Sequence, residues 1–274
     1  MRSVFVLLAV FLQGCSVTRV AYDNADVFLR WQVNYYFDLQ GEQPDELDRG
    51  LAALLAWHRA QALPQYARLS EDAAARMERG VRLEDLEWSY DALQAQVKEA
   101  LGAAAGESAG LLDRLSPAQI GHLEQRLAEE NRKFAKEQLQ GTMEERHQRR
   151  VKRNVEQLEE WYGPLGDAQV ARVRLYSARA PFSAELRERD RKRRQAEFVA
   201  MLRAREAKRR LAHWLDAWES DREPAYAEAA LATRGEYMQL LLDLDKTLSI
   251  EQRKRAAARL RRYAALFDSM SRMQ

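Results

Sequence analysis

The sequence predicts an all-α protein built from many helices. The chain has only 12 Gly and 6 Pro in 274 residues, and residues that favour helices, such as Ala, Leu, Glu, Gln and Arg, dominate it. Two segments, 115–134 and 248–267, each begin with a strong helix-start signal, in which a Ser is followed three positions later by a Gln. No series of segments shows the alternation expected of a sheet.

The apolar spacing and the helix-breaking residues divide the first half of the chain. We expect an aromatic-rich helix over 20–37, and a second helix to about residue 63 that Pro64 interrupts or kinks. Residues 65–79 are expected to form a polar helix. The next helix begins at Leu83 and carries an apolar seam at helical spacing, which predicts helix packing, at Leu86, Tyr90, Leu93, Val97 and Leu101. The stretch 102–110, rich in Ala, Gly and Ser, is the best candidate for a hinge.

The second half of the chain is divided by the same signals. The helix that starts at residue 117 keeps its apolar period beyond Gly141, so we expect it to continue to Tyr162. Residues 167–180 predict a weaker helix, for which a short strand is the alternative. A long charged helix is expected over 183–219, another begins at Pro224, and the segment 248–267 closes the chain.

The N-terminus predicts export. Residues 1–14 have a short basic start and an apolar core too short to span a bilayer, as in a signal peptide. Leu12-Gln13-Gly14-Cys15 then resembles a bacterial lipobox, although Gln13 replaces the usual small residue. We therefore expect Cys15 to be lipidated and residues 15–19 to act as a tether, the alternative being a buried N-terminal segment with an incidental Cys. The acyl chains would attach the protein to a membrane.

The residues around Cys15 also predict location and redox state. Ser16, by resemblance to the common lipoprotein sorting rule, favours the periplasmic face of the outer membrane over the inner membrane. Cys15 is the single Cys of the chain, so no internal disulfide can form. Packing must therefore stabilise the fold.

A Leu-x-x-x-Gln motif recurs at four predicted helix junctions, spaced by 76, 50 and 83 residues. An aromatic pair precedes the first and third motifs, whereas Ser follows Leu in the second and fourth. This alternation suggests an internal duplication; the alternative is that helical proteins reuse the same caps. The motif residues are Leu39 and Gln43, Leu115 and Gln119, Leu165 and Gln169, and Leu248 and Gln252.

The duplication divides the chain into two halves of opposite charge, 20–140 and 141–274. Residues 16–140 have 14 basic and 21 acidic side chains, a net charge of −7, and residues 141–274 have 29 and 21, a net charge of +8. The formal charge of the whole chain is only +2, so the asymmetry is hidden in the total.

Two resemblances follow from these motifs. Leu-Ser-Pro-Ala-Gln at 115–119 and Leu-Ser-Ile-Glu-Gln at 248–252 resemble the LTxxQ motif of the Spy/CpxP periplasmic chaperones, which are thin helical cradles with two motifs per subunit that work as dimers. Four motifs in one chain would imply a fused pseudo-dimer. The segments around Tyr22, Tyr35 and Trp57-His58, together with Cys15, resemble a family of proteobacterial lipoproteins of unknown function, which implies an envelope lipoprotein with a helical fold and supplies no site residues.

The sequence offers no catalytic or metal-binding pattern. Neither a zinc-protease HExxH, a nucleophile elbow, a P-loop nor a dinucleotide fingerprint occurs. Glu144 and His147 form the single Glu-x-x-His pair, whereas a di-iron site needs two. His58, beside Trp57 on an apolar face, is most simply a hydrogen-bonded core or groove residue. We therefore expect no enzymatic activity and no cofactor.

The most distinctive charged surface is a basic run over 187–210, with 11 basic and 4 acidic residues. It predicts either an ordinary solvated helix face or a surface for anionic groups of lipids, lipopolysaccharide or a client protein. The residues proposed to bind a client or an anion are Arg191, Arg193, Arg194, Arg205, Arg209, Arg210, Trp214 and Trp218. An exported protein meets little nucleic acid, so we expect no nucleic-acid partner.

The sequence thus favours a non-catalytic, chaperone-like binding module for envelope proteins or unfolded clients, attached to the outer membrane. The alternatives are an assembly lipoprotein with one dedicated envelope partner and a protein that binds anionic lipid or lipopolysaccharide. The oligomeric state is left open.

Overall fold

The structure, a computed structural model, describes residues 15–272, and this part of the chain contains helices and no strand. The all-α prediction is therefore confirmed. The helices are α2 (Cys15–Asp23), α3 (Ala25–Phe37), α4 (Gln43–Trp57), the π-helix η2 (His58–Ala62), α5 (Leu63–Arg79), α6 (Leu83–Leu112), α7 (Pro117–Gln138), α8 (Met143–Tyr162), α9 (Asp167–Arg179), α10 (Ala184–Arg203), α11 (Ala207–Asp216), α12 (Pro224–Asp245) and α13 (Ile250–Ser271).

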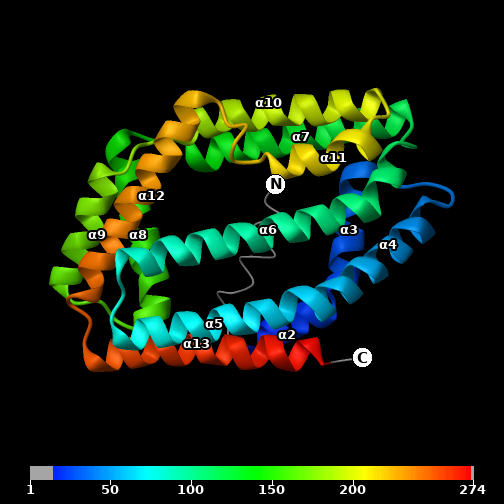
Figure 1. Ribbon diagram of the computed structural model, residues 1–274. Helices are drawn as coiled ribbons and strands as arrows, with labels where there is room; N and C mark the ends of the chain where they lie inside the picture. Colours follow the sequence, from blue (N-terminus) through cyan, green and yellow to red (C-terminus); the bar gives the residue numbers. More distant parts are fainter. Residues whose placement is uncertain (1–14, 273–274) are drawn as a thin grey trace.

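These helices form an open frame (Figure 1). Helices α7, α10 and α11 make one long side, and α5 and α13 make the other. Helices α8, α9 and α12 close one end, α3 and α4 lie at the opposite end, and α6 crosses between the two long sides. The residues expected to form a tether, 15–19, belong to helix α2. The predicted signal peptide, 1–14, lies outside the described residues.

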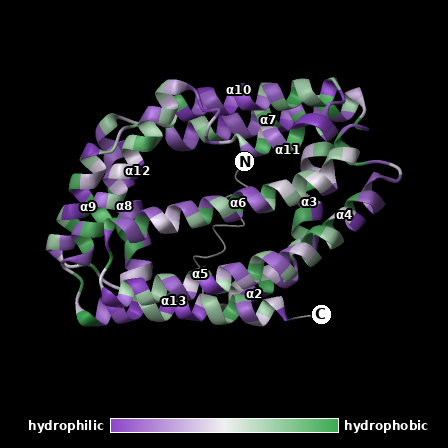
Figure 2. Cartoon of the chain, in the orientation of Figure 1, coloured by the Kyte–Doolittle hydropathy of each residue, from purple (hydrophilic) through white to green (hydrophobic). Residues whose placement is uncertain are grey.

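The frame has three small cores instead of one. The first joins the α6–α7 turn to α10 and α11, the second lies among α8, α9, α12 and the start of α13, and the third lies between α5 and the end of α13. Figure 2 shows why no large core forms: hydrophilic residues predominate on α10 and alternate with narrow hydrophobic patches on the other helices. A helix with a narrow apolar stripe can bury only one side.

The two halves exchange helices. Within the first half α3 packs on α7 and α4 on α6, and within the second half α8 packs on α13 and α9 on α12. Between the halves, α5 packs along α13, and α10 packs along α7. Each long side of the frame therefore contains helices from both halves. The boundary expected at residues 140 and 141 lies in the turn between α7 and α8.

Local chemistry explains the helix starts. Ser116 and Ser249 each accept a hydrogen bond from the backbone N–H of the Gln three positions later, and that Gln side chain returns a bond to the backbone of the Ser. Both predicted capping boxes are therefore present. Thr142 with Glu145 forms a third capping box, which starts α8. Such caps satisfy N–H groups that the helix itself leaves unpaired.

Three expected helices are interrupted. The helix expected over 117–162 ends at Gln138, because Gly141 adopts a positive φ of 93° and Thr142 caps a new helix. The helix expected over 183–219 breaks between α10 and α11, where Arg205 has a φ of 55°. The helix expected over 20–37 is divided at Asn24, whose side-chain amide donates to the Val20 carbonyl at 2.8 Å.

Two expected interruptions are milder or absent. At Pro64, which lacks an N–H, the chain stays helical through the π-helical turn η2. The prediction of a hinge at 102–110 is wrong, because α6 continues without a break to Leu112. Ala105 and Ala109 are buried in the first core with Ala207 of α11, so the small side chains allow close helix packing.

Candidate functional site

The four Leu-x-x-x-Gln motifs meet in pairs. The side-chain amides of Gln43 and Gln119 bond to each other in both directions: Gln119 Nε2 donates to Gln43 Oε1 at 2.7 Å, and Gln43 Nε2 donates to Gln119 Oε1 at 3.3 Å. Gln119 Nε2 also donates to the Asp38 carbonyl at 3.0 Å. We call this arrangement the first glutamine joint; it links the α3–α4 turn to the α6–α7 turn.

The second glutamine joint repeats this geometry between the α8–α9 and α12–α13 turns. Gln169 and Gln252 exchange amide bonds of 2.9 and 3.0 Å. Gln169 Nε2 donates to the Thr247 carbonyl, and Gln252 Nε2 donates to the Pro164 carbonyl. In all four motifs the Gln Oε1 also accepts, at 3.0 Å, from the backbone N–H of the residue after the motif Leu, which is Gln40, Ser116, Gly166 or Ser249.

The motif leucines fix each joint to a core. Leu39 and Leu115 are buried in the first core, and Leu165 and Leu248 pack against the second. The Leu of each motif therefore packs while the Gln bonds across the joint. The structure brings the eight motif residues together in two groups of four, one at each joint, where they connect helix turns. Sequence spacing alone could not show which motif meets which.

The basic run 187–210 is largely paired within the fold. Arg193 contacts Asp190, Glu197 and Asp221 at 2.9, 2.6 and 3.2 Å. Arg194, expected on a binding surface, is only 3% exposed; its guanidinium donates to the Trp214 carbonyl at 2.7 Å and lies 4.3 Å from the Trp214 ring centroid. Burial lowers the pKa of this guanidinium.

The other residues proposed for anion binding are scattered. Arg191 donates to Asn131 at 2.8 Å, Arg209 and Arg210 both pair with Glu206, and Arg205 is exposed at the α10–α11 turn. The ring of Trp214 stacks on Phe198 with a centroid distance of 5.3 Å, and Arg222 covers Trp218 at 5.1 Å. These contacts join α10 to α7 and α11 or lie within the turns on either side of α11, and they do not assemble one anion-binding surface. Acidic side chains supply most of the partners.

Helix α6 has an apolar seam that no core covers. Of its residues from 83 to 104, only Asp85 is buried, and Leu93 is 54% exposed. We use "α6 seam" for Leu86, Leu93, Val97 and Leu101. The sequence predicted that this seam packs against a helix. Leu86, Val97 and Leu101 are partly buried, and α6 packs on α4, α5, α11 and α12, whereas Leu93 stays exposed. Polar contacts also hold this part of α6. The Tyr90 hydroxyl donates to Glu219 at 2.8 Å, and Lys98 pairs with Asp216 at 3.1 Å.

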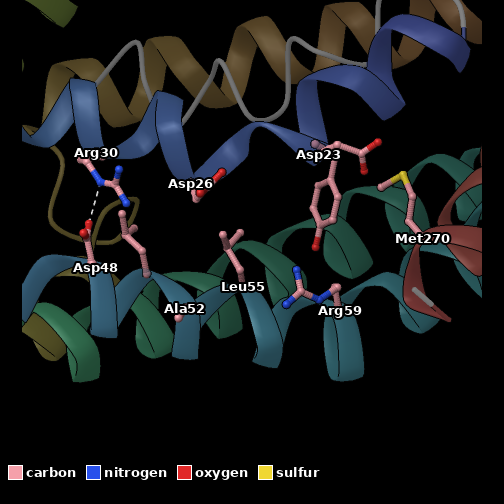
Figure 3. A pocket seen from close by; sticks show the side chains of 10 residues that line it. Asp23, Asp26, Arg30, Asp48, Ala52, Leu55, Arg59 and Met270 are labelled. Carbon is pink, nitrogen blue, oxygen red and sulfur yellow. Dashed lines mark hydrogen bonds and ion pairs between the residues drawn. The ribbon is translucent and has the colours of Figure 1, made fainter. Parts of the chain in front are cut away.

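A cleft of about 580 Å³ lies between the α2–α3 segment and α4 (Figure 3). The Arg30–Asp48 ion pair, at 2.6 Å, lies at one end, and Met270 lies at the other. The lining residues are Tyr22, Asp23, Asp26, Arg30, Asp48, Leu51, Ala52, Leu55, Arg59 and Met270. The mixture of apolar side chains with charges of both signs suits an amphipathic segment better than a small anion.

The Tyr22 wall of the cleft is fixed by His58. The Tyr22 hydroxyl lies 3.0 Å from His58 Nδ1, and the ring of Tyr66 packs edge-on against His58 at a centroid distance of 5.5 Å. Burial, with a smaller contribution from Arg59, lowers the pKa of His58 to about 4. His58 is therefore neutral at neutral pH and contacts the cleft through the Tyr22 hydroxyl, without lining it.

The described residues provide neither a metal centre nor a membrane span. In the range 15–272, no three His, Cys, Asp or Glu side chains gather closely enough to hold a metal ion. No helix in the same range combines the length and the apolar character needed to cross a bilayer.

Comparison with known families gives one result. A family described as a family of unknown function, DUF6279, matches residues 35–226. The chain belongs to the DUF6279 family. No curated protein and no solved structure matched the chain. The resemblance to an uncharacterised family is thus confirmed, while lipidation of Cys15 and the likeness to Spy/CpxP chaperones stay predictions.

The DUF6279 match covers the first three Leu-x-x-x-Gln motifs. It therefore includes the whole first glutamine joint and one side of the second. It begins after Cys15 and ends before Leu248, so neither the predicted lipid anchor nor the fourth motif belongs to the matched region.

Proposed function

We propose that this DUF6279 protein is a non-catalytic, chaperone-like binding module, attached through Cys15 to the periplasmic face of the outer membrane. The observation that carries the proposal is the α6 seam. Apolar side chains at helical spacing lie on a helix that crosses an open frame, and none of the three cores covers them. Covering such a surface with an apolar segment of another protein lowers the free energy of the complex.

The glutamine joints support this function indirectly. They fasten the helix turns at both ends of the frame with hydrogen bonds and with leucines that pack against the first and second cores. A rigid frame presents its apolar surface at a lower cost in conformational entropy than a flexible one.

The acidic and basic contacts argue against the anion-binding alternative. Most of the basic run is already engaged by carboxylates or by backbone carbonyls, as Arg193 and Arg194 are. A chaperone-like role that uses apolar contacts does not need those side chains to be free. Arg-to-Glu changes there would test folding more than binding, because Arg194 is buried.

The test is suppression of aggregation of two unrelated denatured proteins, followed by light scattering. Leu93→Gln should weaken the suppression, because covering the exposed half of a Leu side chain contributes about 1 kcal/mol, or roughly a five-fold change in affinity. Leu175→Gln is the matched control, since Leu175 on α9 is 48% exposed and outside the seam. Equal loss in both variants, or no suppression by the unmodified protein at molar excess, would refute the proposal.

A further inference from the structure

Helix α3 has an apolar face that no other helix covers. Val27, Phe28 and Trp31 are 56%, 38% and 60% exposed, and Val20 of α2 is 61% exposed. We call Val27, Phe28 and Trp31 the aromatic stripe. Val27 and Trp31 are four residues apart and therefore lie on one side of the helix. The Trp31 ring stacks on Tyr35 at a centroid distance of 5.9 Å, which fixes its orientation.

The rest of α3 is accounted for by other contacts. Val33, Tyr36 and Phe37 pack against the first core. Arg30, on the flank that faces the cleft, pairs with Asp48 at 2.6 Å (Figure 3). The aromatic stripe is thus a separate third face, and it contains no charged side chain. Exposed Trp and Phe on an uncharged helix face are typical of the headgroup region of a membrane.

The position of the stripe in the chain points to its occupant. Helix α2 begins at Cys15 itself, so no extended linker separates the predicted lipid attachment site from the fold. At 1.5 Å per helical residue, Trp31 lies within about 24 Å of Cys15 along the chain. We propose that the aromatic stripe inserts into the headgroup region of the bilayer to which Cys15 is attached. This inference rests on the lipidation of Cys15 in the proposed function.

The consequence is a fixed orientation. The acyl chains would provide one attachment and the stripe a second, so the frame would lie against the membrane instead of moving freely around its anchor. The α6 seam, on a different helix, would remain available to a client.

The experiment uses the full lipidated chain in phosphatidylcholine vesicles whose acyl chains carry bromine, which quenches nearby Trp fluorescence. The chain has six Trp residues, so single replacements identify the quenched one. We expect Trp31→Phe to remove most of the quenching. Trp88→Phe should leave it unchanged, because Trp88 on α6 lies under the Arg76 guanidinium, 4.0 Å from its ring centroid.

Mass spectrometry of the same sample separates the possible failures. If the lipid mass is present and Trp31 is not quenched, the membrane contact is wrong while the anchor stands. If the lipid mass is absent, the anchor fails first, and this inference fails with it. If the lipidated chain forms dimers in detergent that Trp31→Phe dissociates, the stripe is a contact between two copies and the proposal is overturned.

Discussion

Replacing Gln119 by Ala would test whether the glutamine joints stabilise the frame. Gln119 is 4% exposed, and its side chain makes four hydrogen bonds: one to Ser116, one to Asp38 and two to Gln43. In the variant, the N–H of Ser116 and the amide of Gln43 lose buried partners. At about 1 kcal/mol for each lost bond, with the two bonds to Gln43 counted as one contact, the free energy of unfolding should fall by about 3 kcal/mol.

Urea unfolding followed by Trp fluorescence measures this loss. A change of that size moves the midpoint by about 1 M for a chain of this length. Gln125→Ala is the matched control, because Gln125 is exposed on the same helix, and it should change the free energy by less than about 0.5 kcal/mol.

A double-mutant cycle isolates the contact between the two amides. Gln43→Ala and Gln119→Ala should be non-additive by about 1 kcal/mol or more, since each removes the partner of the other. Gln119→Ala and Gln169→Ala, at different joints, should be additive. Equal effects of Gln119→Ala and Gln125→Ala would refute the conclusion that the joint is a stabilising contact.

The remaining predictions concern a pH effect and a helix cap. Because the pKa of His58 in the folded state, about 4, lies below the unfolded value of 6.5, protonation favours unfolding. The contribution of His58 is therefore complete above pH 6.5 and is lost as the pH falls toward 4, by about 3 kcal/mol in all; His58→Gln should remove this part of the pH dependence of unfolding, and an unchanged profile would contradict the assignment. Ser249→Ala should cost about 1 kcal/mol of stability by calorimetry, whereas Ser249→Asp, which can still cap α13, should cost little; equal losses would mean that the cap is unimportant.

The sequence carried strong signals where the determining contacts are local. The capping boxes at Ser116 and Ser249 depend on residues three positions apart, so the helix starts were predicted and are present. The end of α8 at Gly163 and the start of α12 at Pro224 also follow from the residues themselves. Gly allows a positive φ, and Pro suits a first helical turn.

Tertiary contacts overruled the local signals elsewhere. The small-residue stretch 102–110 predicted a hinge, yet α6 remains continuous there, and Ala105 and Ala109 let α11 approach closely. The apolar period continues across Gly141, but the helix ends there because Gly141 adopts a positive φ, which the spacing of apolar residues cannot predict. The basic run predicted an exposed surface, whereas Arg194 is buried with Asp221 and the Trp214 carbonyl as partners from other segments.

By itself, the sequence determined a helical chain with four Leu-x-x-x-Gln junctions, because helix propensity and caps act over a few residues. Only the tertiary structure decided that Gln43 meets Gln119 and that Gln169 meets Gln252, across 76 and 83 residues. It also decided that α5 packs on α13 and α10 on α7, across the two halves, and that the α6 seam lies outside the three cores. These outcomes depend on how narrow apolar stripes from distant helices share three small cores, and no single segment contains that information.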